Sequence, residues 1–214
     1  MLKHFVFVVL ITVIAATLAF GCGDTGVESE PGDPELRQKY PGLDKFHILQ
    51  AVDYDEMIAL LEGEEVSVIY FGWSTCPWCE QYVPYFDDVG RQKEWSTIYK
   101  FNIRDTRQAL ADSETGEYSL APEFQAIVDI LGPENINTID RPAGCEGEEC
   151  QQLPWFSVPS IFVMQQGEII AQRIGAVPGH QRVDGELPPM TDDERSTLMA
   201  ELEALFDAAL QAAP

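Results

Sequence analysis

Basic residues are scarce in this chain. Thirteen Lys and Arg residues stand against 36 Asp and Glu residues, so the formal net charge is −23. A nucleic-acid partner is therefore not expected, because binding to a phosphate backbone needs clustered positive charge. The acidic residues are spread along the chain without a run of five or six, which is typical of a solvated surface. A preference for basic partner proteins is the alternative explanation of this charge.

Histidine is also scarce, with three residues in the chain. His4 lies in a segment that we expect to be removed, while His47 and His180 are distant in sequence from every cysteine. We therefore expect His47 and His180 at surface or edge positions. Neither a metal site nor a cofactor is predicted.

An apolar run over residues 5–20 follows Lys3 and has the pattern of a secretory signal, which we place at residues 1–21. Sixteen helical residues span about 24 Å, less than a bilayer core of about 30 Å, so we favour a cleaved signal over a permanent membrane helix. Residues 18–22 resemble the cleavage box of bacterial lipoproteins, although Phe20 is larger than the residue usual there. We predict lipidation of Cys22, with ordinary secretion and a free thiol as the alternative.

Residues 22–44 lack apolar periodicity and predict a flexible tether, followed by one domain over residues 45–214. The predicted location is extracytoplasmic, on a bacterial membrane through the lipid anchor.

The cysteine count supports this interpretation, because five is an odd number. If Cys22 carries lipid, the other four residues form two pairs, Cys76 with Cys79 and Cys145 with Cys150. Export to an oxidising compartment makes disulfide formation the expected fate of both pairs.

The first pair lies where a strand is expected to meet a helix. The β-branched and aromatic run 66–73 predicts a buried strand, and Cys76 follows it directly. Pro77 suits the first helical position, where its missing N–H costs nothing. The helix N-terminus then favours the thiolate of Cys76. On spacing alone, Cys76 and Cys79 could equally form half of a zinc site.

A second feature favours redox chemistry. Val158 and Pro159 open the predicted strand 160–164, and a turn at 165–167 leads to another strand at 169–174. Together with Cys76, Cys79 and Pro84, which lies eight residues after Cys76, Pro159 gives the chain a pattern that resembles the thioredoxin-like superfamily over about residues 46–210. The resemblance implies an α/β fold with a central mixed β-sheet flanked by helices, and a cis bond before Pro159.

Further elements are predicted by periodicity and capping signals. The strand–helix–strand successions predict parallel strand pairing. The expected elements are a strand at 46–52, a helix from Asp53 to Gly63, a strand at 97–103, a helix from Pro122 and a last helix after Thr191.

Residues 133–157 form a long connection that we predict as an insertion before Pro159. Within it, Cys145 and Cys150 would close a tight loop as a structural disulfide. A second redox pair that relays electrons to Cys76 and Cys79 is an alternative. A four-cysteine zinc site is disfavoured, because the two pairs are far apart in sequence.

The resemblance also implies roles for individual residues. Cys76 would be the nucleophile, and Cys79 would resolve the mixed disulfide. The backbone at Val158, beside cis-Pro159, would pair with an extended substrate chain. Trp73 and Trp78 would form the rim that contacts substrate, or would only cover the strand end.

Two departures from thioredoxins bear on the chemistry. Tyr70 stands where thioredoxins carry a buried Asp, so a proton on Cys79 must move through water or another group. The dipeptide between the cysteines is Pro-Trp and brings no cation, while Glu80 opposes the thiolate, so we expect a moderate lowering of the Cys76 pKa.

These features predict a thiol-disulfide oxidoreductase that acts on cysteine-containing extracytoplasmic proteins and on a redox partner. The alternative is a non-catalytic accessory module that binds a partner through the same surface. The signal, the tether and the C-P-x-C motif also resemble, loosely, the bacteriocin transport accessory proteins.

Overall fold

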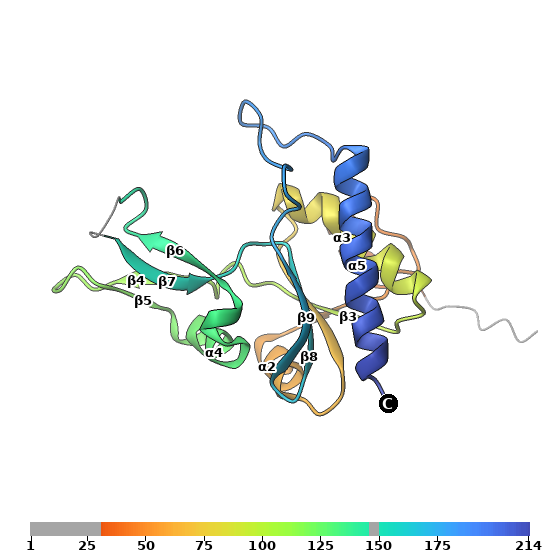
Figure 1. The fold of residues 1–214 in the computed structure, drawn as a ribbon, viewed down its shortest axis with the longest axis horizontal. Helices are drawn as coiled ribbons and strands as arrows, with labels where there is room; N and C mark the ends of the chain where they lie inside the picture. Colours follow the sequence, from red (N-terminus) through yellow and green to blue (C-terminus); the bar gives the residue numbers. More distant parts are fainter. Residues whose placement is uncertain (1–30, 146–149) are drawn as a thin grey trace, which may run out of the picture.

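A five-stranded mixed sheet forms the centre of the computed structural model, which describes residues 31–145 and 150–214 (Figure 1). The strand order is β1-β3-β2-β8-β9, in which β1, β3 and β2 run parallel and β8 and β9 are antiparallel additions. The predicted signal, Cys22 and the first part of the tether, up to residue 30, lie outside the described residues. The strands are β1 (Leu49–Val52), β2 (Ser67–Phe71), β3 (Ile98–Phe101), β8 (Ser160–Gln165) and β9 (Glu168–Ile174).

Helices cover both faces of this sheet. The central strand β2 is buried at every residue, and its side chains alternate between two apolar clusters. Val68 and Tyr70 face the helices α1, α3 and α5, whereas Ile69 and Phe71 face α2 and α4. The helices are α1 (Pro34–Lys39), α2 (Tyr54–Glu62), α3 (Pro77–Gln92), α4 (Pro122–Leu131) and α5 (Asp192–Ala212). This architecture confirms the predicted α/β fold class, with a central mixed sheet flanked by helices.

The two predicted capping boxes are both present. Asp53 caps α2, and the Glu56 carboxylate accepts a hydrogen bond from the Asp53 backbone N–H at 3.0 Å. Thr191 and Glu194 make the same reciprocal pair at the start of α5. Each box satisfies backbone donors that a helix N-terminus leaves free, which is why both boundaries could be located from the sequence.

Two expectations about the chain path need correction. The next strand of the central sheet after α4 is β8, and it is antiparallel to β2, so strand–helix–strand succession predicts parallel pairing only for the earlier strands of this sheet. The predicted tether is ordered from Pro34 onward, because Asp33 caps α1 and the side chains of Leu36 and Tyr40 are buried against the core. Leu36 and Tyr40 are the apolar residues from which packing of this segment against the core could have been predicted.

Between β3 and β8 the chain forms an arm of two hairpins beside the sheet, which projects to the left in Figure 1. The hairpin β4–β5 was not predicted, whereas β6–β7 lies within the expected insertion. Gln151 joins the two hairpins, because its side chain accepts from Tyr118 N at 2.7 Å and donates to Tyr118 O at 2.6 Å. The arm contains β4 (Ala109–Ala111), β5 (Tyr118–Leu120), the 3-10 turn Pro133–Asn135, β6 (Asn137–Arg141) and β7 (Gln151–Trp155).

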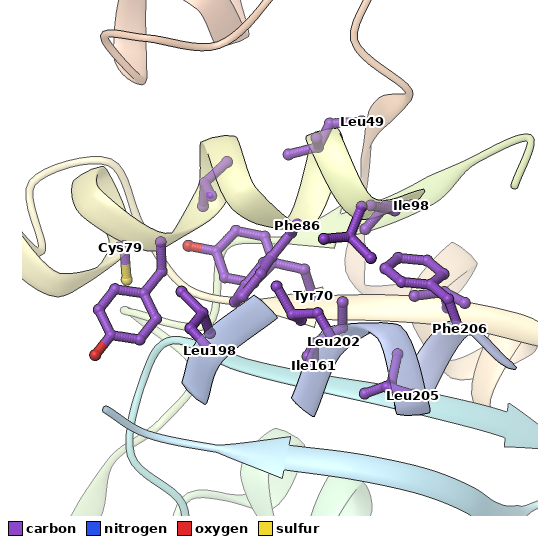
Figure 2. Packing of buried hydrophobic residues seen from close by; sticks show 14 of the residues in the cluster. Leu49, Tyr70, Cys79, Phe86, Ile98, Ile161, Leu198, Leu202, Leu205 and Phe206 are labelled. Carbon is purple, nitrogen blue, oxygen red and sulfur yellow. The ribbon is translucent and has the colours of Figure 1, made fainter. Parts of the chain in front are cut away.

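The cluster between the sheet and α3 with α5 reaches the dithiol. Figure 2 shows Phe86 packed among Tyr70, Leu198 and Leu202, with Cys79 at one end of the cluster. Phe86 and Tyr70 meet edge to face, with ring centroids 5.5 Å apart. Packing of Cys76, Cys79 and Tyr82 in this same cluster holds the start of α3, and with it the two sulfur atoms, in place.

No helix in residues 31–145 and 150–214 is both long enough and apolar enough to cross a membrane.

Candidate active site

The two cysteines of the motif lie at the N-terminus of α3, as the spacing predicts. Cys76 is the N-cap, Pro77 takes the first helical position, and both thiols are free. The Cys76 sulfur accepts a hydrogen bond from Cys79 N, with N and Sγ 3.4 Å apart. Cys76 is 5% exposed and Cys79 is fully buried. Access from solvent therefore favours Cys76 as the first sulfur to react.

The surroundings of the two thiols shift their pKa values in opposite directions, downward for Cys76 and upward for Cys79. The Cys79 side chain donates to the Cys76 sulfur, and this bond, helped by the helix N–H groups of Cys79 and Trp78, lowers the Cys76 pKa to about 7 against desolvation. Burial raises the pKa of Cys79 well above the ordinary thiol value of 9.0, and the neighbouring Cys76 sulfur raises it further. Near neutral pH, Cys76 is thus partly ionised, whereas Cys79 keeps its proton. A Cys76 pKa of about 7 agrees with the moderate lowering that we expect from the sequence.

A cavity of about 340 Å³ opens beside Cys76. Its lining brings Cys76 together with three other residues singled out in the sequence, Trp73, Trp78 and Val158. The Val158–Pro159 bond is cis, as the resemblance implies, and Pro159 is buried at the start of β8. The Val158 backbone makes no hydrogen bond to another described residue. Its N–H and C=O are therefore free to pair with an extended chain.

Two further residues of the cavity wall, Arg107 and Trp155, were not predicted. The guanidinium of Arg107 lies between two indoles, 5.1 Å from the Trp73 ring and 5.0 Å from the Trp155 ring. It also donates to Phe156 O at 2.6 Å. Burial lowers the pKa of Arg107, but an arginine stays protonated in proteins. A fixed positive charge therefore lies close to the Cys76 thiolate, where it adds to the lowering of the Cys76 pKa.

Tyr70 and Tyr40 place two hydroxyl groups near Cys79. The Tyr70 hydroxyl bonds the Cys79 sulfur and favours its thiolate, and it lies 3.4 Å from the Tyr40 hydroxyl. Burial raises the pKa of both tyrosines, so both keep their protons. Lys100 is buried beside Tyr70 in the parallel register of β2 and β3. The lysine at an apolar-face strand position was the sequence signal for this group of polar side chains near Cys79.

The prediction that His180 lies at the surface is wrong. His180 is 4% exposed and stacks on Tyr82 of α3, with ring centroids 5.6 Å apart. Its Nε2 donates to Pro188 O at 2.9 Å, and its Nδ1 accepts from the Tyr82 hydroxyl at 3.0 Å. Its own carbonyl accepts from Trp78 Nε1 at 3.3 Å, which ties the connection before α5 to the dithiol helix. Contact between residues so distant in sequence could not be inferred from the sequence.

His47 is also buried, at 4% exposed, rather than at the surface. Its Nε2 lies 3.0 Å from Asp33 O, so the ring helps to hold the start of α1 in place. Within the described part of the chain, no group of three or more His, Cys, Asp or Glu residues is placed to hold a metal ion.

Cys145 and Cys150 are joined by a disulfide at the end of the arm. Trp155 lies at the other end of β7 and lines the cavity beside Cys76. At roughly 3.3 Å per strand residue, β7 separates this disulfide from the cavity by on the order of 16 Å.

Comparisons with known proteins give remote likenesses. No family model matches the chain, and no curated protein matches it significantly. Among solved structures, a thioredoxin of Malassezia sympodialis (Mala s 13) is 14% identical with a TM-score of 0.36, covering 73% of this chain and 92% of that one. Thioredoxin O2 of Arabidopsis thaliana in the oxidised state is 16% identical with a TM-score of 0.34, covering 61% and 84%. At these values neither neighbour bears on function, which has to be inferred from the dithiol itself.

Proposed function

We propose that this chain is a thiol-disulfide oxidoreductase that exchanges disulfides with protein cysteines through Cys76 and Cys79. The observation that carries the proposal is the division of acidity between two free sulfurs at one helix N-terminus. A nucleophile with a pKa near ambient pH gives the fastest exchange, because it combines thiolate content with nucleophilicity. The protonated partner one helical turn further in is suited to the second step.

The reaction consists of two exchanges. The Cys76 thiolate attacks one sulfur of a substrate disulfide, a Cys76–substrate bond forms, and the other substrate sulfur leaves as a thiolate. Cys79 then loses its proton and attacks Cys76 Sγ, which releases the second substrate thiolate and leaves a Cys76–Cys79 disulfide. The substrate gains two electrons, and the dithiol loses two. The reverse sequence oxidises a substrate dithiol, so the direction depends on the redox partner.

Activity assays on the full chain in non-ionic detergent test this proposal. Reduction of insulin disulfides with dithiothreitol as the electron source measures one direction, and reoxidation of reduced ribonuclease measures the other. Activity in either assay that disappears in Cys76→Ser supports the proposal. A chain that binds reduced or oxidised partners without exchanging sulfur would instead be the accessory module.

The location is a further part of the proposal. We infer an extracytoplasmic protein held on a bacterial membrane by lipid on Cys22, in accordance with the apolar segment at residues 5–20 and the odd cysteine count. In the native host, Cys22→Ser should move the protein from the detergent-extracted membrane fraction to the soluble fraction. Unchanged membrane association would show that the apolar segment is an uncleaved anchor.

The distance along β7 supports a structural role for the Cys145–Cys150 disulfide. A relay would require one of these sulfurs to contact Cys76, but the length of β7 lies between them. We therefore propose that this disulfide closes the end of the arm and that its reduction is not part of the catalytic cycle.

A further inference from the structure

Four arginines surround the cavity beside Cys76. Arg107 lies in its wall, and Arg104 donates to Thr75 Oγ1 at 3.3 Å at the rim. The guanidinium of Arg141 lies 5.4 Å from the Trp155 ring, and that of Arg182 lies 5.1 Å from the Trp78 ring. Each of the four thus contacts a residue that lines the cavity.

None of these arginines pairs with a carboxylate among the described residues. Ion pairs in this part of the chain involve five other cations, namely Lys39, Arg91, Lys93, Arg173 and Arg195. No Asp or Glu lines the cavity either. In a chain with 36 acidic residues, four arginines without a carboxylate partner among the described residues thus lie around the reactive sulfur.

The indoles explain how these positive charges are held without carboxylates. Faces of Trp73, Trp78 and Trp155 carry negative quadrupole density that attracts a guanidinium without using its N–H groups as hydrogen-bond donors, so the N–H groups that do not donate to a backbone carbonyl can bind another acceptor. Those N–H groups form a planar donor set that matches a carboxylate. The cavity therefore presents apolar walls with anion-binding donors, next to the thiolate.

We propose that the substrate of the Cys76–Cys79 dithiol is a polypeptide segment that carries acidic side chains next to its reactive cysteine. The inference rests on the proposed function and names its substrate class. The free Val158 N–H and C=O bind the extended backbone of the segment, and Arg107 with Arg104 binds its carboxylates. The remaining surface is acidic and repels such a segment, so the arginines select both the substrate and the orientation in which it approaches.

Three disulfide-bridged reporter peptides test this inference. They differ only in the residues flanking the cysteine, which are Glu, Gln or Lys, and each is mixed with the reduced full chain in detergent. The second-order rate of the first exchange is measured under single-turnover conditions at low salt and in about 1 M salt, where the Debye length is about 3 Å. We expect the Glu peptide to react roughly tenfold faster than the Lys peptide at low salt, with most of the difference lost at high salt.

Variants distinguish substrate binding from an indirect effect on Cys76. In Arg104→Gln/Arg107→Gln the order of the peptides should invert, because the net negative charge of the protein then dominates the encounter. The matched control Arg37→Gln/Lys45→Gln removes two exposed charges that do not line the cavity and should keep the wild-type order. Since Arg107 is partly buried, Arg104→Gln/Arg182→Gln, which changes two exposed residues, provides a second variant with a reduced Glu preference.

The outcomes separate the two proposals. Ratios between peptides cancel any change in Cys76 reactivity, so an equal slowing of all peptides in Arg104→Gln/Arg107→Gln would assign Arg107 to thiolate stabilisation alone and overturn the inference. Equal rates for the three peptides with the wild-type chain would overturn it as well, while leaving the proposed function intact. Exchange with none of the peptides would overturn the proposed function and the inference together.

Discussion

The reactivity of Cys76 should titrate near pH 7 rather than near pH 9. The structure lowers the Cys76 pKa from 9.0 to about 7, which corresponds to roughly 3 kcal/mol of preferential stabilisation of the thiolate. At pH 7 about half of the thiol is ionised, against about one part in a hundred for an unperturbed thiol. The lower basicity reduces the intrinsic nucleophilicity by about eightfold, so the net gain in rate at pH 7 is about sixfold.

Alkylation of the reduced full chain with iodoacetamide measures this pKa, with peptide mass spectrometry to separate Cys76 from Cys79. The rate at Cys76 should rise with pH and level off once the pH is above its pKa. Because the bond from Cys79 is the largest cause of the lowering, Cys79→Ala should move the midpoint upward, and Cys79→Ser, which keeps a donor, should move it less. A wild-type midpoint near 9, or a midpoint that does not change in Cys79→Ala, would refute this account of the thiolate.

Three more predictions follow from the same geometry. Cys79→Ser should leave covalent substrate complexes on non-reducing gels and Cys76→Ser almost none, whereas equal trapping by both variants, or trapping by neither, would overturn the assigned roles. Tyr70→Phe removes a hydrogen bond that favours the Cys79 thiolate, so the mixed disulfide should persist roughly fivefold longer in stopped-flow traces while its formation is unchanged. Cys145→Ser with Cys150→Ser should lower the free energy of unfolding in urea by about 2 kcal/mol while exchange continues, and loss of exchange in a folded double mutant would favour a relay.

Much of the fold could be predicted because its signals are local. The boundaries of α2 and α5 depend on capping boxes within four residues, and β2 is marked by a continuous run of β-branched and aromatic residues. The dithiol is equally local, since a strand end, an N-cap cysteine and Pro77 are adjacent in the chain. The prediction of α4 from Pro122 succeeded for the same reason.

The failures share a different cause, because they concern contacts between distant segments. His180 is buried by Tyr82, 98 residues earlier, and Tyr40 is ordered by its contact with Tyr70, 30 residues later. A polar residue offers no periodic signal for such contacts. The large distance in sequence between His180 and every cysteine therefore suggested a surface position instead. The short strands β4 and β5, each three residues long, also fall below the length at which alternation can be recognised.

The predicted and the unpredicted residues have different roles in the site: the predicted ones carry the reactive sulfurs, and the unpredicted ones form the cavity wall. Cys76 and Cys79 belong to the sheet-and-helix framework, whose packing sets the reactivity of the sulfurs. Arg107 precedes the arm and Trp155 ends its second hairpin, so the cavity wall is built from the connection between β3 and β8. The backbone of the framework is constrained by a core on both faces, whereas connecting segments such as the arm generally tolerate change more readily. Substitutions in the arm should therefore alter which substrates react with Cys76 while leaving its pKa nearly unchanged.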